Sequence, residues 1–144
     1  MSFTLRDAES LTVLGTYARA ENANPGKIGD LWRSFHAIGS ATAIKARLDD
    51  SVYCVYCEYE TDFMGGFTVL VGCAVDADAA VPEGMKKLEI EAGKFAVYDV
   101  VGELPKGVIE TWAEIWNAPL ERRYQADFDR YGSDGKVTIH VGVR

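Results

Sequence analysis

The sequence predicts an α+β fold in which two helices lie on one face of an antiparallel sheet, with a groove between them. Three observations carry this prediction. Short segments alternate between apolar and polar residues as strands do, two segments repeat apolar residues at helical spacing, and the order strand, helix, hairpin occurs twice. The 144 residues, 48% of them hydrophobic, suffice for one domain with a sizeable core.

The first half of the chain, about residues 1–78, contains each element of this order. Residues 11–19 (LTVLGTYAR) alternate and are rich in β-branched and aromatic side chains, which predicts a strand. Residues 52–59 and 67–75 are two further strand-like runs, and the glycines between them favour a hairpin. A helix is predicted between the run 11–19 and the run 52–59, where Asn24 and Pro25 start it. Apolar residues at helical spacing form a stripe along this helix, and the stripe continues weakly past Gly39. Its apolar positions are Ile28, Leu31, Trp32, Phe35 and Ile38, then Ile44 and Leu48.

The second half, about residues 84–144, repeats the order after the acidic, proline-containing segment DADAAVPEG. Residues 87–102 have strand character, and the runs ADFDRYG and KVTIHVGV predict a second hairpin through residues 133–135. A helix starts at Pro105 and ends at residues 117–119. Its apolar positions are Val108, Ile109, Trp112, Ile115 and Trp116. In each helix a tryptophan stands four residues after the first apolar residue of the stripe. Because the order of elements is also repeated, we infer a duplicated unit.

Charge and hydropathy exclude several classes of partner. The formal net charge is -7 and no cluster of Lys and Arg stands out, which argues against direct nucleic-acid binding and weakly favours cationic ligands. No apolar run approaches the roughly eighteen residues of a membrane helix, and the N-terminal residues lack the pattern of a signal peptide. We therefore expect a cytoplasmic protein without a membrane partner.

The cysteines are expected to be free, buried and structural. Cys54 and Cys57 form a CxxC pair, but zinc would need a second pair and only Cys73 remains. A redox CxxC opens a helix after a strand, whereas this one lies within a strand-like run, where residues three apart face opposite sides. No metal and no cofactor is therefore expected.

An aspartate in the strand-like run YQADFDRYG identifies a candidate ligand site. Alternation places Asp127, Asp129 and Tyr131 on one face and Phe128 on the other. A carboxylate under the helices is costly unless it has a partner. That partner is either a bound cation or an arginine, and solvent at a strand edge is a third explanation. The candidate arginines are Arg122, Arg123 and Arg130.

The order of several motifs resembles that of GyrI-like effector-binding domains, which sense drugs in multidrug-responsive transcription activators. These motifs are YCVYCEYETDFMGGFTVLVG, PEGMKKLEIEAGKFAVYDVVG, VIETWAEIW and DFDRYG, and the resemblance covers nearly the whole chain from about residue 10. Stand-alone members exist, some of them encoded on integron gene cassettes. The resemblance implies a single effector-binding domain, residues 1–144, built of two pseudo-symmetric modules with a ligand groove between the helices. Since the first predicted strand begins near the N-terminus, no DNA-binding region is expected before it.

The resemblance also implies which residues bind the ligand. The family's motif of phenylalanine, glutamate, any residue and tyrosine falls on residues 128–131, and its glutamate contacts positive charge. Here Asp129 replaces that glutamate with a side chain one methylene shorter. The tryptophans lie in apolar stripes, so packing in the core and lining the groove are both open for them. Tyr98 occupies a family position near the groove, or belongs to the core.

The first hairpin offers a second acid. Tyr56 and Glu58 share a face by alternation, Cys57 and Tyr59 share the other, and alternation does not decide which face is covered. Pseudo-symmetry makes Glu58 the counterpart of Asp129. The predicted ligand-binding residues are therefore Asp129, Tyr131, Trp112, Trp116, Trp32, Tyr56, Glu58 and Tyr98.

The leading functional hypothesis is a non-catalytic binding module for lipophilic, cationic small molecules, acting as sensor, carrier or sink. The chain has no nucleophile elbow, phosphate loop or metal cluster, which favours binding over catalysis. The resemblance implies two alternatives: hydrolysis of cyclopropane-bearing toxins by Glu58 and Asp129, and inhibition of DNA gyrase by direct contact. A second copy of the chain or a regulatory protein is open as a further partner.

Overall fold

The computed structural model describes residues 3–21, 26–37, 47–61, 65–104 and 106–144. Within these residues, eight strands and two helices follow one another: β1 (Phe3–Ala8), β2 (Leu11–Ala20), α1 (Gly26–Ala37), β3 (Val52–Cys57), β4 (Phe67–Val75), β5 (Lys86–Ile90), β6 (Gly93–Asp99), α3 (Lys106–Trp116), β7 (Ala126–Tyr131) and β8 (Val137–Val143).

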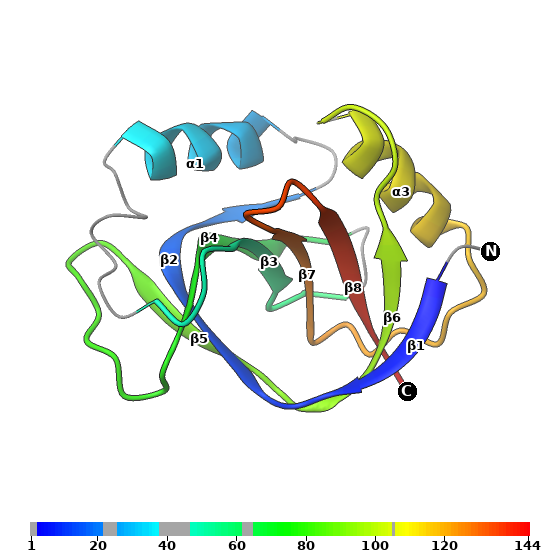
Figure 1. Ribbon diagram of the computed structural model, residues 1–144, viewed down its shortest axis with the longest axis horizontal. Helices are drawn as coiled ribbons and strands as arrows, with labels where there is room; N and C mark the ends of the chain where they lie inside the picture. The colour runs from blue at the N-terminus through cyan, green and yellow to red at the C-terminus, as the bar shows by residue number, and fades with distance from the viewer. Residues whose placement is uncertain (1–2, 22–25, 38–46, 62–64, 105) are drawn as a thin grey trace.

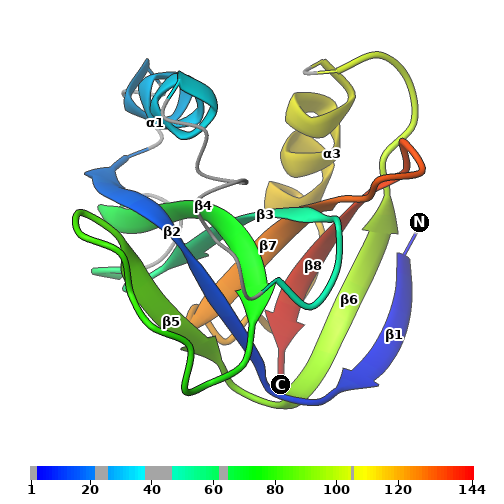
Figure 2. The same ribbon diagram turned by 60° about the vertical axis from the view of Figure 1, so that its left-hand side comes forward.

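The predicted α+β architecture is confirmed. All eight strands form one antiparallel sheet in the order β1-β6-β8-β7-β3-β4-β2-β5. Figures 1 and 2 show α1 and α3 standing apart from each other on the same side of the sheet. The order is symmetrical about the β3–β7 pair, because β4 and β2 follow β3 on one side as β8 and β6 follow β7 on the other. The two predicted hairpins are β3–β4 and β7–β8.

The edge strands depart from the predicted layout. β1 was not predicted at all, because its residues are exposed beyond Phe3 and carry no apolar stripe; it forms by pairing with β6. The predicted strand segment 87–102 consists of two strands, β5 and β6, which lie near opposite ends of the sheet. The extension of the first helix past Gly39 falls largely outside the described residues.

The core lies on both faces of the sheet. Under α1, Leu31 and Phe35 pack against apolar side chains of β3 and β4, and under α3 Ile115 packs against β6 and β8. On the other face Phe128 of β7 contacts Phe95 of β6 (ring centroids 5.9 Å apart), within a cluster that also holds side chains of β2 and β5. Strands from both ends of the sheet thus share one cluster, so the sheet curls around the face that the helices leave uncovered.

The cysteines are buried, and none of the three is in a disulfide, as predicted. Cys54 packs in the cluster beneath α1 and Cys57 in the cluster on the opposite face. Burial raises the pKa of the Cys57 thiol to about 12, so this thiol stays protonated and unreactive at neutral pH. Among the described residues no helix is long and apolar enough to cross a membrane.

Two glycines allow β2 and β4 to approach closely. Gly15 pairs directly with Gly72. A Cβ atom at Gly72 would lie 2.0 Å from the carbonyl oxygen of Leu14, and one at Gly15 would lie 1.9 Å from that of Val71. Both neighbours are backbone atoms of strands that are paired on both sides, so they cannot move aside without breaking strand pairing.

We expect Gly72→Ala to lower the free energy of unfolding by about 3 kcal/mol or more, because the added methyl group overlaps the backbone of β2. Gly29→Ala in α1 is the control, since its Cβ would have no neighbour closer than 3.7 Å. This change should raise stability by roughly 0.5–1 kcal/mol. Urea unfolding of both variants measures the difference, and a Gly72→Ala protein as stable as wild type would contradict the close approach.

Candidate functional site

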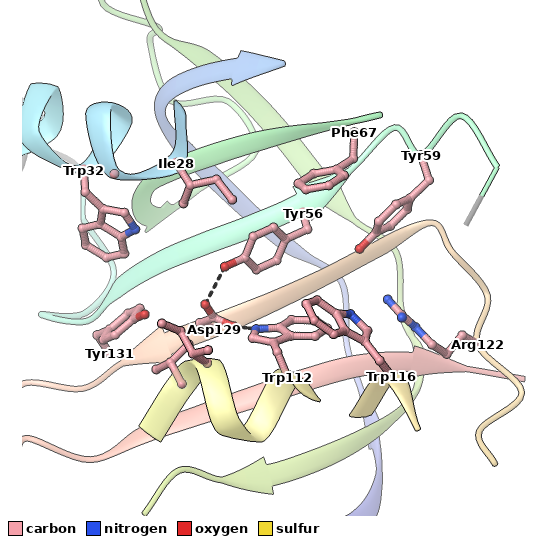
Figure 3. A pocket seen from close by; sticks show the side chains of 13 residues that line it. Ile28, Trp32, Tyr56, Tyr59, Phe67, Trp112, Trp116, Arg122, Asp129 and Tyr131 are labelled. Carbon is pink, nitrogen blue, oxygen red and sulfur yellow. Dashed lines mark hydrogen bonds between the residues drawn. The ribbon is translucent and has the colours of Figure 1, made fainter. Parts of the chain in front are cut away.

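A cavity of about 490 Å³ lies between α1 and α3, with strands β3, β4 and β7 as its floor. Figure 3 shows aromatic side chains entering it from both helices and from the sheet. The residues that line the cavity are Ile28, Gly29, Trp32, Tyr56, Tyr59, Phe67, Val108, Ile109, Trp112, Trp116, Arg122, Asp129 and Tyr131. The space between the helices is therefore largely apolar, with one aspartate and one arginine in its wall.

The structure brings most of the predicted site residues into this one cavity. Those that line it are Trp32, Tyr56, Trp112, Trp116, Asp129 and Tyr131. The predicted alternation of β7 is confirmed, because Asp127, Asp129 and Tyr131 face the helices while Phe128 packs on the opposite side. The cavity therefore joins residues from both halves of the chain.

Asp129 lies at the base of the cavity and is only 1% exposed. Figure 3 shows its carboxylate between two donors: the hydroxyl of Tyr56 donates to Oδ2 at 2.8 Å, and Nε1 of Trp112 donates to Oδ1 at 2.9 Å. The hydroxyl of Tyr131 also acts on this carboxyl and lowers its pKa. Among the described residues no lysine or arginine forms an ion pair with it. The carboxylate is therefore held in place by neutral donors alone.

The protonation of Asp129 reflects this environment. Burial raises the pKa of its carboxyl from 3.8 to about 7, and the hydrogen bonds from Tyr56 and Trp112 act in the opposite direction. The nearby negative charge of Asp127 raises the pKa further. Near neutral pH the group therefore exists in both forms, and a positive charge beside it would favour the ionised one.

The arginine that was considered as a partner for Asp129 pairs instead with Asp127. Nη2 of Arg122 lies 2.8 Å from Oδ2 of Asp127, the backbone N–H of Gly142 donates to Oδ1 at 2.8 Å, and the hydroxyl of Tyr59 donates to Oδ2. Asp127 has no solvent exposure and Arg122 is 7% exposed. Of two acids on one face of β7, the first is neutralised by an arginine, and the second has no cationic partner in the part of the chain that the structure describes.

The aromatic walls of the cavity face in different directions. The rings of Tyr56 and Trp112 lie at 79° to each other with centroids 5.3 Å apart, and those of Trp32 and Tyr131 lie at 80° with centroids 5.0 Å apart. Trp116 stands near the mouth and is 39% exposed. Ring faces directed at different angles can contact ligands of varied shape, and each face attracts positive charge.

The prediction for Glu58 was wrong in its geometry. β3 ends at Cys57, and Glu58 has a φ of 51°, which turns the chain and breaks the alternation. Its carboxylate accepts hydrogen bonds from Thr68 (2.6 Å) and Lys86 (3.1 Å) away from the cavity, and these two partners lower its pKa. Tyr59 takes its place in the wall.

Tyr98 also lies outside the cavity. It is 1% exposed and packs in the cluster beneath α3, with its ring 5.2 Å from that of Phe3. Of the two readings left open for this residue, the structure supports core packing. β6 is separated from the cavity floor by β8, so its side chains meet the buried face of α3 instead of the groove.

Several lining residues were missed. Ile28, Val108 and Ile109 stand in the predicted helical stripes, so their apolar spacing was a signal, although it did not separate core from cavity. Alternation placed Tyr59 on the face opposite Tyr56 and left open which face is covered, whereas both side chains line the cavity. Arg122, which follows the helix in an irregular segment, has no periodic signal. The described part of the chain contains no group of three or more His, Cys, Asp or Glu residues able to hold a metal ion.

Comparison with solved structures finds the same fold in other proteins. An integron cassette protein from the mobile metagenome of Vibrio cholerae is 32% identical, with a TM-score of 0.83 over 99% of this chain and 96% of that one. The protein SAV2435, solved with bound tetraphenylphosphonium, has a TM-score of 0.81 at 18% identity, over 100% of this chain and 94% of that one, which shows a common fold.

Sequence comparison agrees with the structural one. YobU of Bacillus subtilis (strain 168), described as a candidate transcriptional regulator, is 30% identical in an alignment of 114 residues that covers 73% of this chain and 71% of YobU. The profile of the integron-associated effector binding proteins, Cass2, matches residues 4–143. The resemblance inferred from the motifs is thereby confirmed. This chain belongs to the family of integron-associated effector binding proteins.

Proposed function

We propose that this protein binds lipophilic cations in the cavity between its two helices, as a sensor, carrier or sink without catalysis. The observation that carries the proposal is the Asp129 carboxylate, buried at the base of an aromatic cavity and held only by neutral donors. A cationic ligand supplies the charge that this carboxylate lacks.

The energies of the contacts are sufficient for useful affinity. A positive charge about 4 Å from the carboxylate gains roughly 4 kcal/mol at an effective dielectric constant near 20. Each contact with an aromatic face adds about 0.5–2 kcal/mol, and the cavity offers rings from Trp32, Tyr56 and Trp112. After the losses of association, these contacts are consistent with micromolar binding, about 8 kcal/mol.

The ionised side chain of Asp129 lowers the stability of the folded protein. Its raised pKa means that its ionised form opposes folding, and an apolar or amide side chain there would avoid this penalty. A residue that disfavours the folded state and faces a cavity is typical of a binding site, where function offsets stability. Asp127, two residues away, shows the contrasting arrangement of a structural acid with its own arginine.

The comparisons support the class of ligand. The family is one of effector binding proteins, and tetraphenylphosphonium, bound to the similarly folded SAV2435, is itself a lipophilic cation. We infer that the same class fits this cavity. The description of YobU as a candidate regulator favours the role of sensor, exerted through a partner.

The geometry does not favour the hydrolytic alternative. That alternative places Glu58 and Asp129 together in the groove, whereas Glu58 lies outside the cavity with Lys86 and Thr68. Inhibition of gyrase, a homodimeric state and a cytoplasmic location stay predictions.

The first test removes the charge. Asp129→Asn keeps the shape of the side chain, and its amide can still accept from Trp112 and donate to the Tyr56 hydroxyl. We expect tetraphenylphosphonium to bind this variant about 10- to 100-fold more weakly, measured by calorimetry or tryptophan fluorescence. Glu58→Gln, which also neutralises an acid but outside the cavity, should bind like wild type. Equal affinity for wild type and Asp129→Asn would refute the proposal.

The second test varies the pH. Since only the ionised carboxylate attracts a cation and its pKa is about 7, affinity for tetraphenylphosphonium should rise on the order of tenfold between about pH 6 and pH 8 and then level off. Tetraphenylphosphonium does not titrate, so the change reports on the protein. The Asp129→Asn variant should show a flat profile, and a wild-type profile that is equally flat would count against Asp129 as the cation's partner.

The third test measures the cost of the buried acid. A carboxyl whose pKa is raised on folding stabilises the protein below its unfolded pKa and loses that contribution as the pH rises through about 7. In the absence of cations, Asp129→Asn should therefore gain stability over wild type by on the order of 1 to 3 kcal/mol between about pH 5 and pH 8. Urea unfolding at both pH values checks this, and a difference that does not change with pH would show that Asp129 carries no such cost.

A further inference from the structure

The second charged residue in the cavity wall, Arg122, has hydrogen-bonding capacity that its ion pair does not use. Its Nη2 group donates to Asp127, but its Nε and Nη1 groups have no acceptor among the residues that the structure describes, although both are buried. The side chain is 4% exposed. Buried donors without acceptors are uncommon in folded proteins, and here they belong to a residue that lines a ligand cavity.

The neighbours of Arg122 compensate its charge but not its donors. The guanidinium lies over the ring of Tyr124 (4.4 Å to the centroid) and near that of Trp112 (5.8 Å). Ring faces attract a cation, yet they do not replace an oxygen acceptor in line with an N–H group. The guanidinium is therefore electrically neutralised by Asp127 and still short of hydrogen-bond acceptors.

The position of Arg122 sets where such an acceptor would lie. Figure 3 shows the guanidinium at the end of the cavity farthest from Trp32, beyond the rings of Trp112 and Trp116. Asp127, which holds it, is two residues from Asp129 on the same face of β7, a spacing of about 7 Å. The cavity thus has a site for positive charge at its base and a group of donors some ångströms away.

From this arrangement we propose that Arg122 forms a second subsite, in which its free N–H groups donate hydrogen bonds to a carbonyl oxygen of the ligand. This rests on the proposed function and narrows the ligand class to lipophilic cations that also carry a carbonyl group several ångströms from the positive centre. A neutral carbonyl fits better than a carboxylate, because Asp127 already neutralises the guanidinium and Asp129 lies nearby.

A ligand reaches these donors only when a neighbouring ring moves aside, since both nitrogens are covered. The rings that contact the guanidinium are those of Tyr124 and Trp112. The subsite therefore opens only when the ligand binds.

A matched pair of dyes tests the proposal. Tetramethylrhodamine methyl ester and tetramethylrosamine are both xanthylium cations and differ only in the ester group. Fluorescence anisotropy titrations of the wild-type protein should give about tenfold tighter binding of the ester, the amount expected for one hydrogen bond to a charged donor. Equal affinities would overturn the Arg122 subsite while leaving cation binding intact, and failure of both dyes to bind would overturn both proposals.

Substitutions at Arg122 and Asp127 test whether Arg122 causes the preference for the ester. Arg122→Met alone would leave Asp127 as a bare buried carboxylate, so it is combined with Asp127→Asn, whose amide oxygen can still accept from Gly142. In the double variant the ratio of the two affinities should fall from about tenfold to near one. Arg123→Met is the control, since Arg123 lies against Phe95 outside the cavity, and it should keep the full ratio. A preference for the ester that persists in the double variant would assign it to apolar contacts and overturn the proposal.

Discussion

Two carboxylates on one strand, treated in opposite ways, are the constraint on which the site depends. Asp127 and Asp129 both point from β7 toward the helices, where a charge without a partner is unfavourable. Arg122 neutralises the first, and the backbone of Gly142 and the hydroxyl of Tyr59 complete its hydrogen bonds. Asp129 receives hydrogen bonds but, from the residues that the structure describes, no cation, and it lines the cavity.

The site exists only when both halves of the chain are folded together. β3 and β7 pair at the centre of the sheet, with Cys54 opposite Asp129 and Tyr56 opposite Asp127. This pairing lets Tyr56, from the first half, reach the carboxylate of the second half, while Trp112 reaches it from α3. The symmetrical sheet order thus places the seam between the halves directly beneath the cavity.

The same seam explains why the cavity is not filled. α1 and α3 each cover their own half of the sheet, and their tryptophans project toward the space above the β3–β7 pair. The ring of Trp112 lies at 79° to that of Tyr56, and the ring of Trp32 lies at 80° to that of Tyr131, so neither pair stacks face to face. An apolar space with a few polar groups is the usual character of a small-molecule site, and here the polar groups are Asp129 and Arg122.

Periodicity in the sequence determined the fold class, the two helices, most strands and the face on which Asp129 lies, because alternation and helical spacing are local properties of the chain. It also placed Trp32, Trp112 and Trp116 in stripes facing the sheet.

Tertiary structure alone decided the other features of the site. Because Glu58 has a positive φ, the chain turns there, and Tyr59 lines the cavity in place of Glu58. Because β8 lies between β6 and β7, Tyr98 of β6 stays in the core. Whether an arginine neutralises one aspartate or its neighbour depends on distances between segments that no local pattern encodes. That choice separates a structural ion pair from the proposed binding site.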